Sequence, residues 1–223
     1  MRRLAKEFVK NYSSKKRAEL YLWHRGQQGI DSAPVTDRHF EYAFMVEQIA
    51  KFNIKNKRVL DIGSSGSVLP LIFSNLGNSV TCIDVIPWPI SAKGVEVLVR
   101  DILVNPLPGG NFDVVTCLST IEHVGLGRYG DSLDREGDIK AIKILRSALK
   151  PKGLLLLTTA FGRPAVVFPK HRIYDRGRFR LLTKGFRVIE ERFFGPMDSL
   201  MVYKPCSEKQ TYQIDPRKGY AII

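Results

Sequence analysis

One stretch, residues 58–66, constrains the fold of this 223-residue chain more than any other. It reads RVLDIGSSG, in which an apolar run ends in an acid and a turn of small residues follows. The pattern predicts a short buried strand, a sharp turn over residues 63–66, and a helix carrying Leu69 and Phe73. Such a unit lets backbone N–H groups at a helix start approach a bound group closely. The stretch therefore predicts a cofactor site.

Later apolar runs predict further strands of the same sheet. Residues 79–84 (SVTCID) and 96–101 (EVLVRD) both end in an acid, while 112–118 (FDVVTCL) and 154–159 (LLLLTT) are more uniformly apolar. Asp84 lies about 20 residues beyond the glycine turn, where a carboxylate can hold the hydroxyls of a ribose. Strands that alternate with helices in this way indicate an α/β fold.

With Asp61, Asp84 and Asp101 in series, the chain resembles the class I S-adenosylmethionine-dependent methyltransferases over roughly residues 55–161. In that family the first acid lies near the methionine amino group, the second binds the ribose and the third binds the adenine amine. The resemblance implies S-adenosyl-L-methionine as cofactor. It also implies a Rossmann-like, doubly wound seven-stranded sheet of order 3-2-1-4-5-7-6, whose last pair forms an antiparallel hairpin.

The turn departs from the family's usual D-x-G-x-G-x-G, because serines replace its second and third glycines. An ordinary tight turn and a nicotinamide site are the alternatives, although the latter would need glycines at Ser65 and Val68. On the family pattern, we expect the cofactor to contact the turn, the strand ends and a preceding helix. The expected contacts are Tyr42, Asp61, Gly63, Ser64, Gly66, Asp84, Val85, Asp101, Ile102, Leu118 and Ser119.

A helix is expected to begin at Thr36 or Asp37 and to precede the first strand. Its Arg38, Glu41 and Tyr42 resemble an R-x-x-E-Y motif that comes before the cofactor strand in related methyltransferases, where the helix covers the cofactor. A lid and a plain packing helix are both compatible with the sequence. Beyond the second strand, Trp88 is placed either to flank an adenine ring or simply to pack.

The fourth predicted strand is followed by STIEH and then by a glycine- and acid-rich loop over residues 124–137. In the family this strand end borders the transferred methyl group, so His123 and Glu122 are the acid–base candidates. A structural hydrogen bond is the alternative for His123. The loop resembles an E-H-x-G-L-G-R-Y-G-D-x-x-D run of an uncharacterised methyltransferase subgroup. Candidates for binding the methyl acceptor are Arg128, Tyr129, His171, Arg172 and Tyr174.

Some family members hold a metal at this place through an E-x-x-E-H motif. Ser119 replaces the first carboxylate here, so a metal would need a substitute from the loop. The available substitutes are Asp131, Asp134 and Asp138. We therefore expect no metal.

The net charge of +13 is concentrated in two segments. Residues 1–25 hold eight Lys or Arg against two Glu, and residues 163–187 hold eight against one Asp. Such segments favour an anionic partner. They are also typical of the solvated basic surfaces of a heat-adapted protein.

The domain prediction is a single methyltransferase domain over 1–223, with a helical cap (1–52, including helices over 2–12 and 15–25), a Rossmann-like core (53–205) and a loose tail (206–223). The last strands are expected over 186–194 and 200–203. The N-terminus lacks a signal-peptide core, and the longest apolar run is too short to span a bilayer. The three cysteines have no paired spacing. We expect a cytoplasmic protein without membrane association.

The leading functional prediction is a methyltransferase that moves a methyl group by direct displacement to an oxygen or nitrogen of an anionic small-molecule or saccharide acceptor. The alternative is an RNA methyltransferase that uses the basic segments 1–25 and 163–187. A third possibility, a cofactor-fold subunit without activity, would predict loss of the cofactor acids, and all three are present.

Overall fold

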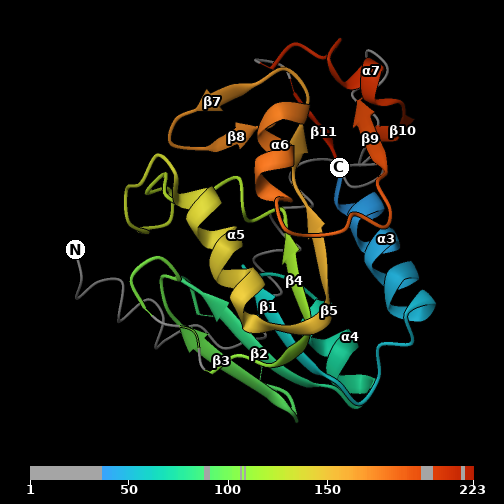
Figure 1. The fold of residues 1–223 in the computed structure, drawn as a ribbon, viewed down its shortest axis with the longest axis vertical. Helices are drawn as coiled ribbons and strands as arrows, with labels where there is room; N and C mark the ends of the chain where they lie inside the picture. The colour runs from blue at the N-terminus through green and yellow to red at the C-terminus, as the bar shows by residue number, and fades with distance from the viewer. Residues whose placement is uncertain (1–36, 88–90, 106, 108, 197–202, 217–218) are drawn as a thin grey trace, which may run out of the picture. The chain divides into compact units, whose positions relative to one another are not determined.

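The computed structural model describes residues 37–87, 91–105, 107, 109–196, 203–216 and 219–223. Helix α3 (Asp37–Lys51) precedes a parallel sheet of order β3-β2-β1-β4-β5 (Figure 1). The strands are β1 (Arg58–Ile62), β2 (Ser79–Asp84), β3 (Val95–Val99), β4 (Phe112–Leu118) and β5 (Leu149–Thr158). The predicted order of these five strands is confirmed, and β2 and β4 have the predicted bounds.

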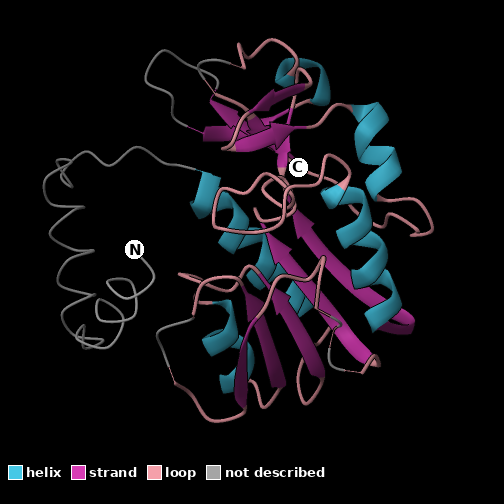
Figure 2. Ribbon diagram, turned by 90° about the vertical axis from the view of Figure 1, so that its left-hand side faces the viewer, coloured by secondary structure: helices cyan, strands magenta, loops and turns pink. Residues whose placement is uncertain are grey.

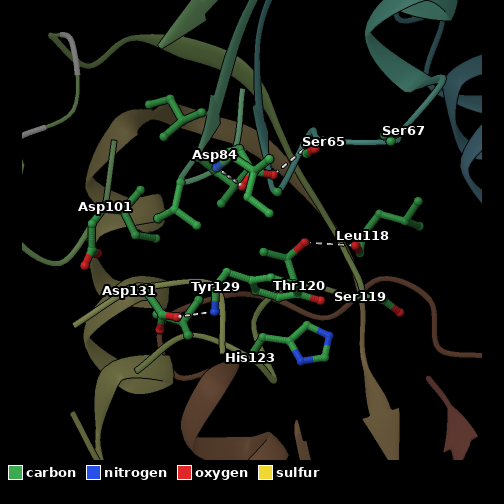
Figure 3. Close-up of a pocket in the computed structure, with 18 of the residues that line it drawn as sticks. Ser65, Ser67, Asp84, Asp101, Leu118, Ser119, Thr120, His123, Tyr129 and Asp131 are labelled. Carbon is green, nitrogen blue, oxygen red and sulfur yellow. Dashed lines mark hydrogen bonds between the residues drawn. The ribbon is translucent and has the colours of Figure 1, made fainter. Parts of the chain in front are cut away.

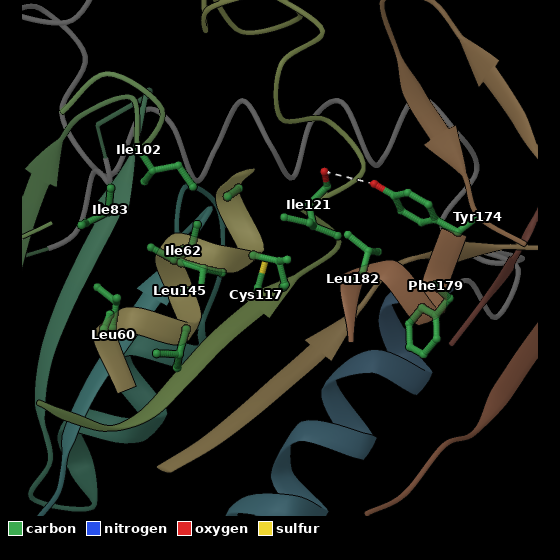
Figure 4. Close-up of a cluster of buried hydrophobic side chains, with 14 of the residues drawn as sticks. Leu60, Ile62, Ile83, Ile102, Cys117, Ile121, Leu145, Tyr174, Phe179 and Leu182 are labelled. Atoms are coloured by element: carbon green, nitrogen blue, oxygen red, sulfur yellow. Dashed lines mark hydrogen bonds between the residues drawn. The ribbon is translucent and has the colours of Figure 1, made fainter. Parts of the chain in front are cut away.

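The central strand β1 is covered on both faces, as expected for a parallel sheet. Leu60 faces a hydrophobic cluster that includes Leu145 of α5 (Gly137–Ala148), and part of this cluster is drawn in Figure 4. Val59 faces a second cluster with Met45 of α3 and Phe73 of α4 (Leu69–Asn75). Each such buried side chain contributes roughly 1.5–3 kcal/mol. The two clusters hold the helices to the sheet and so fix the strand ends.

The chain beyond β5 differs from the prediction. A second sheet has the order β10-β9-β11-β6, and Figure 2 shows it apart from the parallel sheet. Its strands are β6 (Ala160–Phe161), β9 (Phe193–Pro196), β10 (Tyr203–Cys206) and β11 (Ala221–Ile222). The predicted hairpin is present as β9 and β10, but among the described residues it does not extend the parallel sheet to seven strands.

The expected loose tail after residue 205 is wrong. Helix α7 (Glu208–Thr211) begins with a capping box at Ser207. Strand β11 then inserts between β6 and β9 through Ile222, which is buried. The expected strand over 186–194 is realised only at its end, because Val188 and Ile189 are exposed and belong to no strand.

A hairpin and a short helix lie in the chain between β6 and β9, two strands of the second sheet. Strands β7 (Ala165–Val167) and β8 (His171–Ile173) pair antiparallel, and α6 (Arg176–Leu182) follows. The predicted cap of α6 is confirmed, since the carboxylate of Asp175 accepts a hydrogen bond from the N–H of Arg178 at 2.7 Å.

Several predicted features lie outside the described residues. They are the helices over 2–12 and 15–25, the basic segment 1–25, the possible cap Thr36, and Trp88. Within the part of the chain that is described, no helix is long and apolar enough to cross a membrane.

Candidate active site

A pocket opens at the carboxyl ends of β1, β2 and β4, beside the glycine turn (Figure 3). Gly63 fixes the turn, because its N–H donates to the carbonyl of Ile83 at 2.9 Å. Its φ is 75°, and a Cβ at this residue would lie 1.9 Å from Oγ1 of Thr120. Glycine satisfies both the left-handed conformation and the close approach. At Gly63 the turn therefore presents only backbone to the pocket.

Two glycines of the turn provide a matched test of this packing. Gly63→Ala should lower the free energy of unfolding by about 1–3 kcal/mol more than Gly66→Ala, because the added methyl group overpacks against Thr120. Gly66 has nearly the same φ, 76°, but nothing lies within 4 Å of its added Cβ. Urea unfolding of both variants measures the difference. Equal destabilisation would contradict the close approach at Gly63.

Two of the three predicted acids line the pocket with their carboxylates held by backbone N–H groups. Asp84 accepts from Ser65 at 2.9 Å and from Ile86 at 2.9 Å. Asp101 follows β3 and accepts from Leu103 and Ser132, both at 2.8 Å. Burial opposes ionisation of Asp101, but these backbone hydrogen bonds hold its pKa below the ordinary value. Both carboxylates are thus hydrogen-bond acceptors held in fixed positions.

Asp61, the third acid, is buried behind the turn and does not line the pocket. One of its oxygens accepts a hydrogen bond from the hydroxyl of Thr116, while Oδ2 has no partner among the described residues. Burial raises the pKa of Asp61 to about 7, against the effect of the Thr116 hydrogen bond. A buried acceptor without a partner costs about 1–3 kcal/mol. Oδ2 is therefore a buried acceptor that the described protein groups leave unsatisfied.

Most of the expected cofactor contacts lie together. The expected residues that line the pocket are Tyr42, Gly63, Gly66, Asp84, Val85, Asp101, Ile102, Leu118 and Ser119. Asp61 and Ser64 do not line it, because both side chains turn into the protein interior. Lining residues that the sequence analysis did not assign to the site include Arg38, Ser65, Ser67, Arg100, Thr120 and Asp131.

Helix α3 supplies Arg38 and Tyr42 to one wall of the pocket. Between them, Glu41 is only 1% exposed and accepts hydrogen bonds from the hydroxyls of Ser119, after β4, and Thr158, at the end of β5. Burial raises the pKa of Glu41, while Arg38, at 3.1 Å, opposes the shift. The helix is thus joined to the ends of two strands.

The loop after β4 is organised around the side chain of Asp131. Its carboxylate accepts from the backbone N–H groups of Gly125 at 2.8 Å, Gly127 at 3.3 Å and Tyr129 at 3.2 Å. Gly125 and Gly127 have φ of 81° and 71°, which favours glycine at both positions. The folded loop places the ring of Tyr129 at the pocket (Figure 3).

Two predicted acceptor-binding residues instead support this loop from beneath. The guanidinium of Arg172 is 5% exposed and donates to the carbonyls of Val124 at 2.6 Å, Asp134 at 3.2 Å and Arg135 at 3.3 Å. Tyr174 is 1% exposed and donates to the carbonyl of Ile121 (Figure 4). Neither lines the pocket, so their assignment to the acceptor is corrected: both are interior residues.

Glu122 also lies away from the pocket. Its carboxylate is buried and accepts from the hydroxyl of Thr159 at 3.0 Å, and burial raises its pKa to about 7. The carboxylate therefore does not border the space where a methyl acceptor could bind. Its position does not support the predicted acid–base role.

His123 lines the pocket and has a defined tautomer. Its Nδ1 lies 2.6 Å from the carbonyl oxygen of Lys170, which can only accept, so Nδ1 carries the proton and Nε2 is a free acceptor. Burial lowers the pKa of His123 to about 4, and the positive charge of Arg128 also lowers it. His123 is therefore neutral near pH 7, with one nitrogen able to accept a proton.

Aromatic rings continue from His123 in two directions. Tyr129 is 43% exposed, and its ring packs edge-on against that of His123 with 5.7 Å between the ring centroids. The ring centroid of His171 lies 6.4 Å from that of His123. The ring of Tyr220 packs against that of His171, with 5.0 Å between the ring centroids. His171 and Tyr220 do not line the pocket themselves. Tyr220 was not predicted as part of the site, because it lies in the segment expected to be a loose tail.

Three of the eight cations in the basic segment 163–187 are engaged in the fold. Arg176 pairs with Glu191 at 2.8 Å and Glu208 at 2.7 Å, and Arg178 pairs with Asp138 at 2.7 Å. Arg172 is buried beneath the loop. These cations are therefore compensated by acids or carbonyls elsewhere in the chain and do not form an open basic face.

Comparison with known proteins gives partial sequence matches. Residues 108–205 match a family model described as "Caenorhabditis protein of unknown function, DUF268". The ubiquinone biosynthesis O-methyltransferase of Xanthomonas campestris pv. campestris is 32% identical, over 61% of this chain and 56% of that protein. The same enzyme from Xanthomonas oryzae pv. oryzae is 33% identical, over 52% and 48%. The chain thus spans about half the length of the curated relatives it matches.

A solved structure matches the fold over most of the chain. It is Burkholderia thailandensis 1,6-didemethyltoxoflavin-N1-methyltransferase with bound 1,6-didemethyltoxoflavin and S-adenosylhomocysteine. The TM-score is 0.55 at 13% identity, with 79% of each chain covered. The predicted resemblance is confirmed: the chain has the Rossmann-like fold of the class I methyltransferases.

Proposed function

We propose that this protein is an S-adenosyl-L-methionine-dependent methyltransferase that acts on an oxygen or nitrogen of a small acceptor. The observation that carries the proposal is that the glycine turn, Asp84, Asp101 and His123 meet in one pocket. A close backbone turn with acids after the next strands suits a nucleoside cofactor. The names of the relatives and of the matching solved structure support the same activity.

The described residues fit this cofactor at three points. The carboxylate of Asp84 has lone pairs left for the ribose hydroxyls, and that of Asp101 for the adenine amine. The unpartnered Oδ2 of Asp61 is buried behind the turn and would suit the methionine ammonium through a water. When bound, the cofactor supplies a methyl carbon on a positively charged sulfur, and the carbon–sulfur electron pair leaves with the sulfur.

The chain's own contribution is to orient the acceptor and to take its proton. Holding the acceptor atom in line with the methyl carbon accounts for much of the barrier reduction in a direct displacement. Nε2 of His123 is the proton acceptor in this proposal, since the hydrogen bond from Nδ1 to Lys170 leaves Nε2 available. Leu118 and Ser119 complete the wall beside it.

We further propose that the acceptor is an anionic small molecule, with anionic saccharides included. Its support is the exposed cation Arg128, which does not itself line the pocket but lies against His123, a residue that does. RNA is the less favoured acceptor, because Arg172, Arg176 and Arg178 are already paired within the fold. The other basic segment, 1–25, lies outside the described residues.

Asp84→Asn should weaken binding of S-adenosylhomocysteine by about 1–3 kcal/mol, because the amide presents donors where the ribose hydroxyls need acceptors. Isothermal titration calorimetry measures the change. Asp113→Asn is the matched control, since Asp113 also accepts from a backbone N–H, that of Arg58 at 2.9 Å, but near the start of β4. Equal affinities for wild type and Asp84→Asn would contradict the ribose role, and an absence of binding to wild type would contradict the proposed function.

A further inference from the structure

We propose that Arg128 binds a carboxylate group of the methyl acceptor, and that this ion pair prepares His123 to take the acceptor's proton. The inference rests on the proposed function and narrows its substrate class to acids whose carboxylate belongs to the same molecule as the methylated atom. It assigns Arg128 two connected tasks, recognition of the acceptor and adjustment of the neighbouring imidazole.

The charge of Arg128 lacks a counterion among the described residues. Its guanidinium lies over the ring of Tyr129, 4.9 Å from the centroid, and Nη1 donates to the carbonyl of Lys170 at 3.1 Å. The nearby acid Asp131 is occupied by three backbone N–H groups of the loop. In the described part of the chain, Nε and Nη2 of Arg128 make no hydrogen bond, so they can bind a carboxylate in the two-pronged manner typical of arginine.

The side chains of Arg128 and His123 are in contact. Both side chains donate to the carbonyl oxygen of Lys170, which brings Nη1 of Arg128 to 3.4 Å from Nδ1 of His123. Both nitrogens carry hydrogens, so this contact is not a hydrogen bond. A fixed positive charge at this distance disfavours a second positive charge on the imidazole.

Among the other groups around His123, the carbonyl of Lys170 raises the pKa of the imidazole through its hydrogen bond to Nδ1, while the rest lower it or are neutral. Tyr129 comes from the same loop, His171 from β8, and Arg38 from α3, where it is paired with Glu41. Burial, together with Arg128, His171 and Arg38, lowers the pKa of His123 to about 4. A base this weak is poorly matched to proton transfer near neutral pH.

A carboxylate of the acceptor that binds Arg128 raises the proton affinity of His123. It places a negative charge beside the guanidinium and so offsets the field that disfavours the imidazolium. The acceptor's own proton can then pass from its oxygen or nitrogen to Nε2 of His123 as the new bond to the methyl carbon forms. An uncharged acceptor would leave His123 a weak base, so the arrangement discriminates between substrates by charge.

The test uses benzoate and benzamide as probes, because they match in size and shape and differ in charge. The pKa and tautomer of His123 are read by NMR of the full chain labelled with ¹⁵N-histidine, without cofactor. The chain has four histidines, and the signal of His123 is identified by its loss in His123→Gln. The variant is Arg128→Gln, and Arg135→Gln is the matched control, because Arg135 is an exposed arginine of the same loop.

Benzoate should increase the proton affinity of His123 about tenfold or more in wild type and in Arg135→Gln, the low end of the effect of a nearby charge. Benzamide should have no effect, and Arg128→Gln should abolish the response to benzoate while raising the proton affinity of the free protein. A response to benzoate that persists in Arg128→Gln, equal responses to the two probes, or a proton on Nε2 would overturn the proposal. Failure of S-adenosylhomocysteine binding in calorimetry would instead count against the proposed function, because the NMR experiment contains no cofactor.

Discussion

His123→Ala should lower the rate of methyl transfer by about 10²–10⁴-fold, the usual contribution of a positioned acid–base residue. The imidazole is held by the carbonyl of Lys170 with Nε2 unprotonated, and alanine removes that proton acceptor while leaving the turn and both pocket acids in place. The rate is measured as formation of S-adenosylhomocysteine over a panel of small aromatic acids and anionic saccharides, using the acceptor that wild type methylates fastest. Binding of S-adenosylhomocysteine should change less than threefold, or about 0.6 kcal/mol.

His39→Ala is the matched control for this experiment, since His39 belongs to α3 and does not line the pocket. We expect wild-type turnover from it. If His123→Ala kept wild-type turnover, the side chain would have only a structural role. If turnover and cofactor affinity fell together by similar factors, the defect would lie in the pocket as a whole.

Arg172→Met should lower the free energy of unfolding by about 3–5 kcal/mol, the range measured when one partner of a buried charged network is removed. Methionine keeps much of the side-chain volume but leaves the carbonyls of Val124, Asp134 and Arg135 without their buried donor. It also removes a positive charge 3.9 Å from the buried carboxylate of Asp138. Urea denaturation followed by circular dichroism measures the loss.

Arg187→Met controls for the change of residue type, because Arg187 is an exposed arginine of the same basic segment. Surface substitutions of this kind usually change stability by less than about 0.5 kcal/mol. Similar stabilities of the two variants would show that the interior contacts of Arg172 contribute little. A loss confined to Arg172→Met would support its role beneath the loop.

The parallel sheet and much of the pocket could be predicted because their determinants are local. The strands over 79–84 and 112–118 are apolar runs with clear ends, and parallel strands bring Asp84, Asp101 and the glycine turn to one edge. His123 could be found for the same reason, since it follows the end of β4 by a few residues. These features depend on short segments and on the rule that the carboxyl ends of parallel strands meet at one edge of the sheet.

The remaining features depend on contacts between distant segments. Strand β11 has two residues, and its place is set by pairing with Ala160 and Phe194, far earlier in the chain. Tyr174 follows a strand of only a few residues. The alternation of inward and outward side chains cannot be read from so short a strand, so the sequence does not show whether Tyr174 faces the interior or the pocket. The partner of His123 is a backbone carbonyl, which every residue possesses, so the sequence does not single out Lys170.

The hydrogen bonds of Glu41 have a consequence for the binding of a ligand. Because they join α3 to the ends of both β4 and β5, they hold in place the wall that Arg38 and Tyr42 form. A preformed wall requires no ordering of the helix on association, so that cost is absent from the binding free energy. Swinging α3 outward would expose the buried carboxylate of Glu41 and separate it from two hydroxyls, which makes such a motion costly.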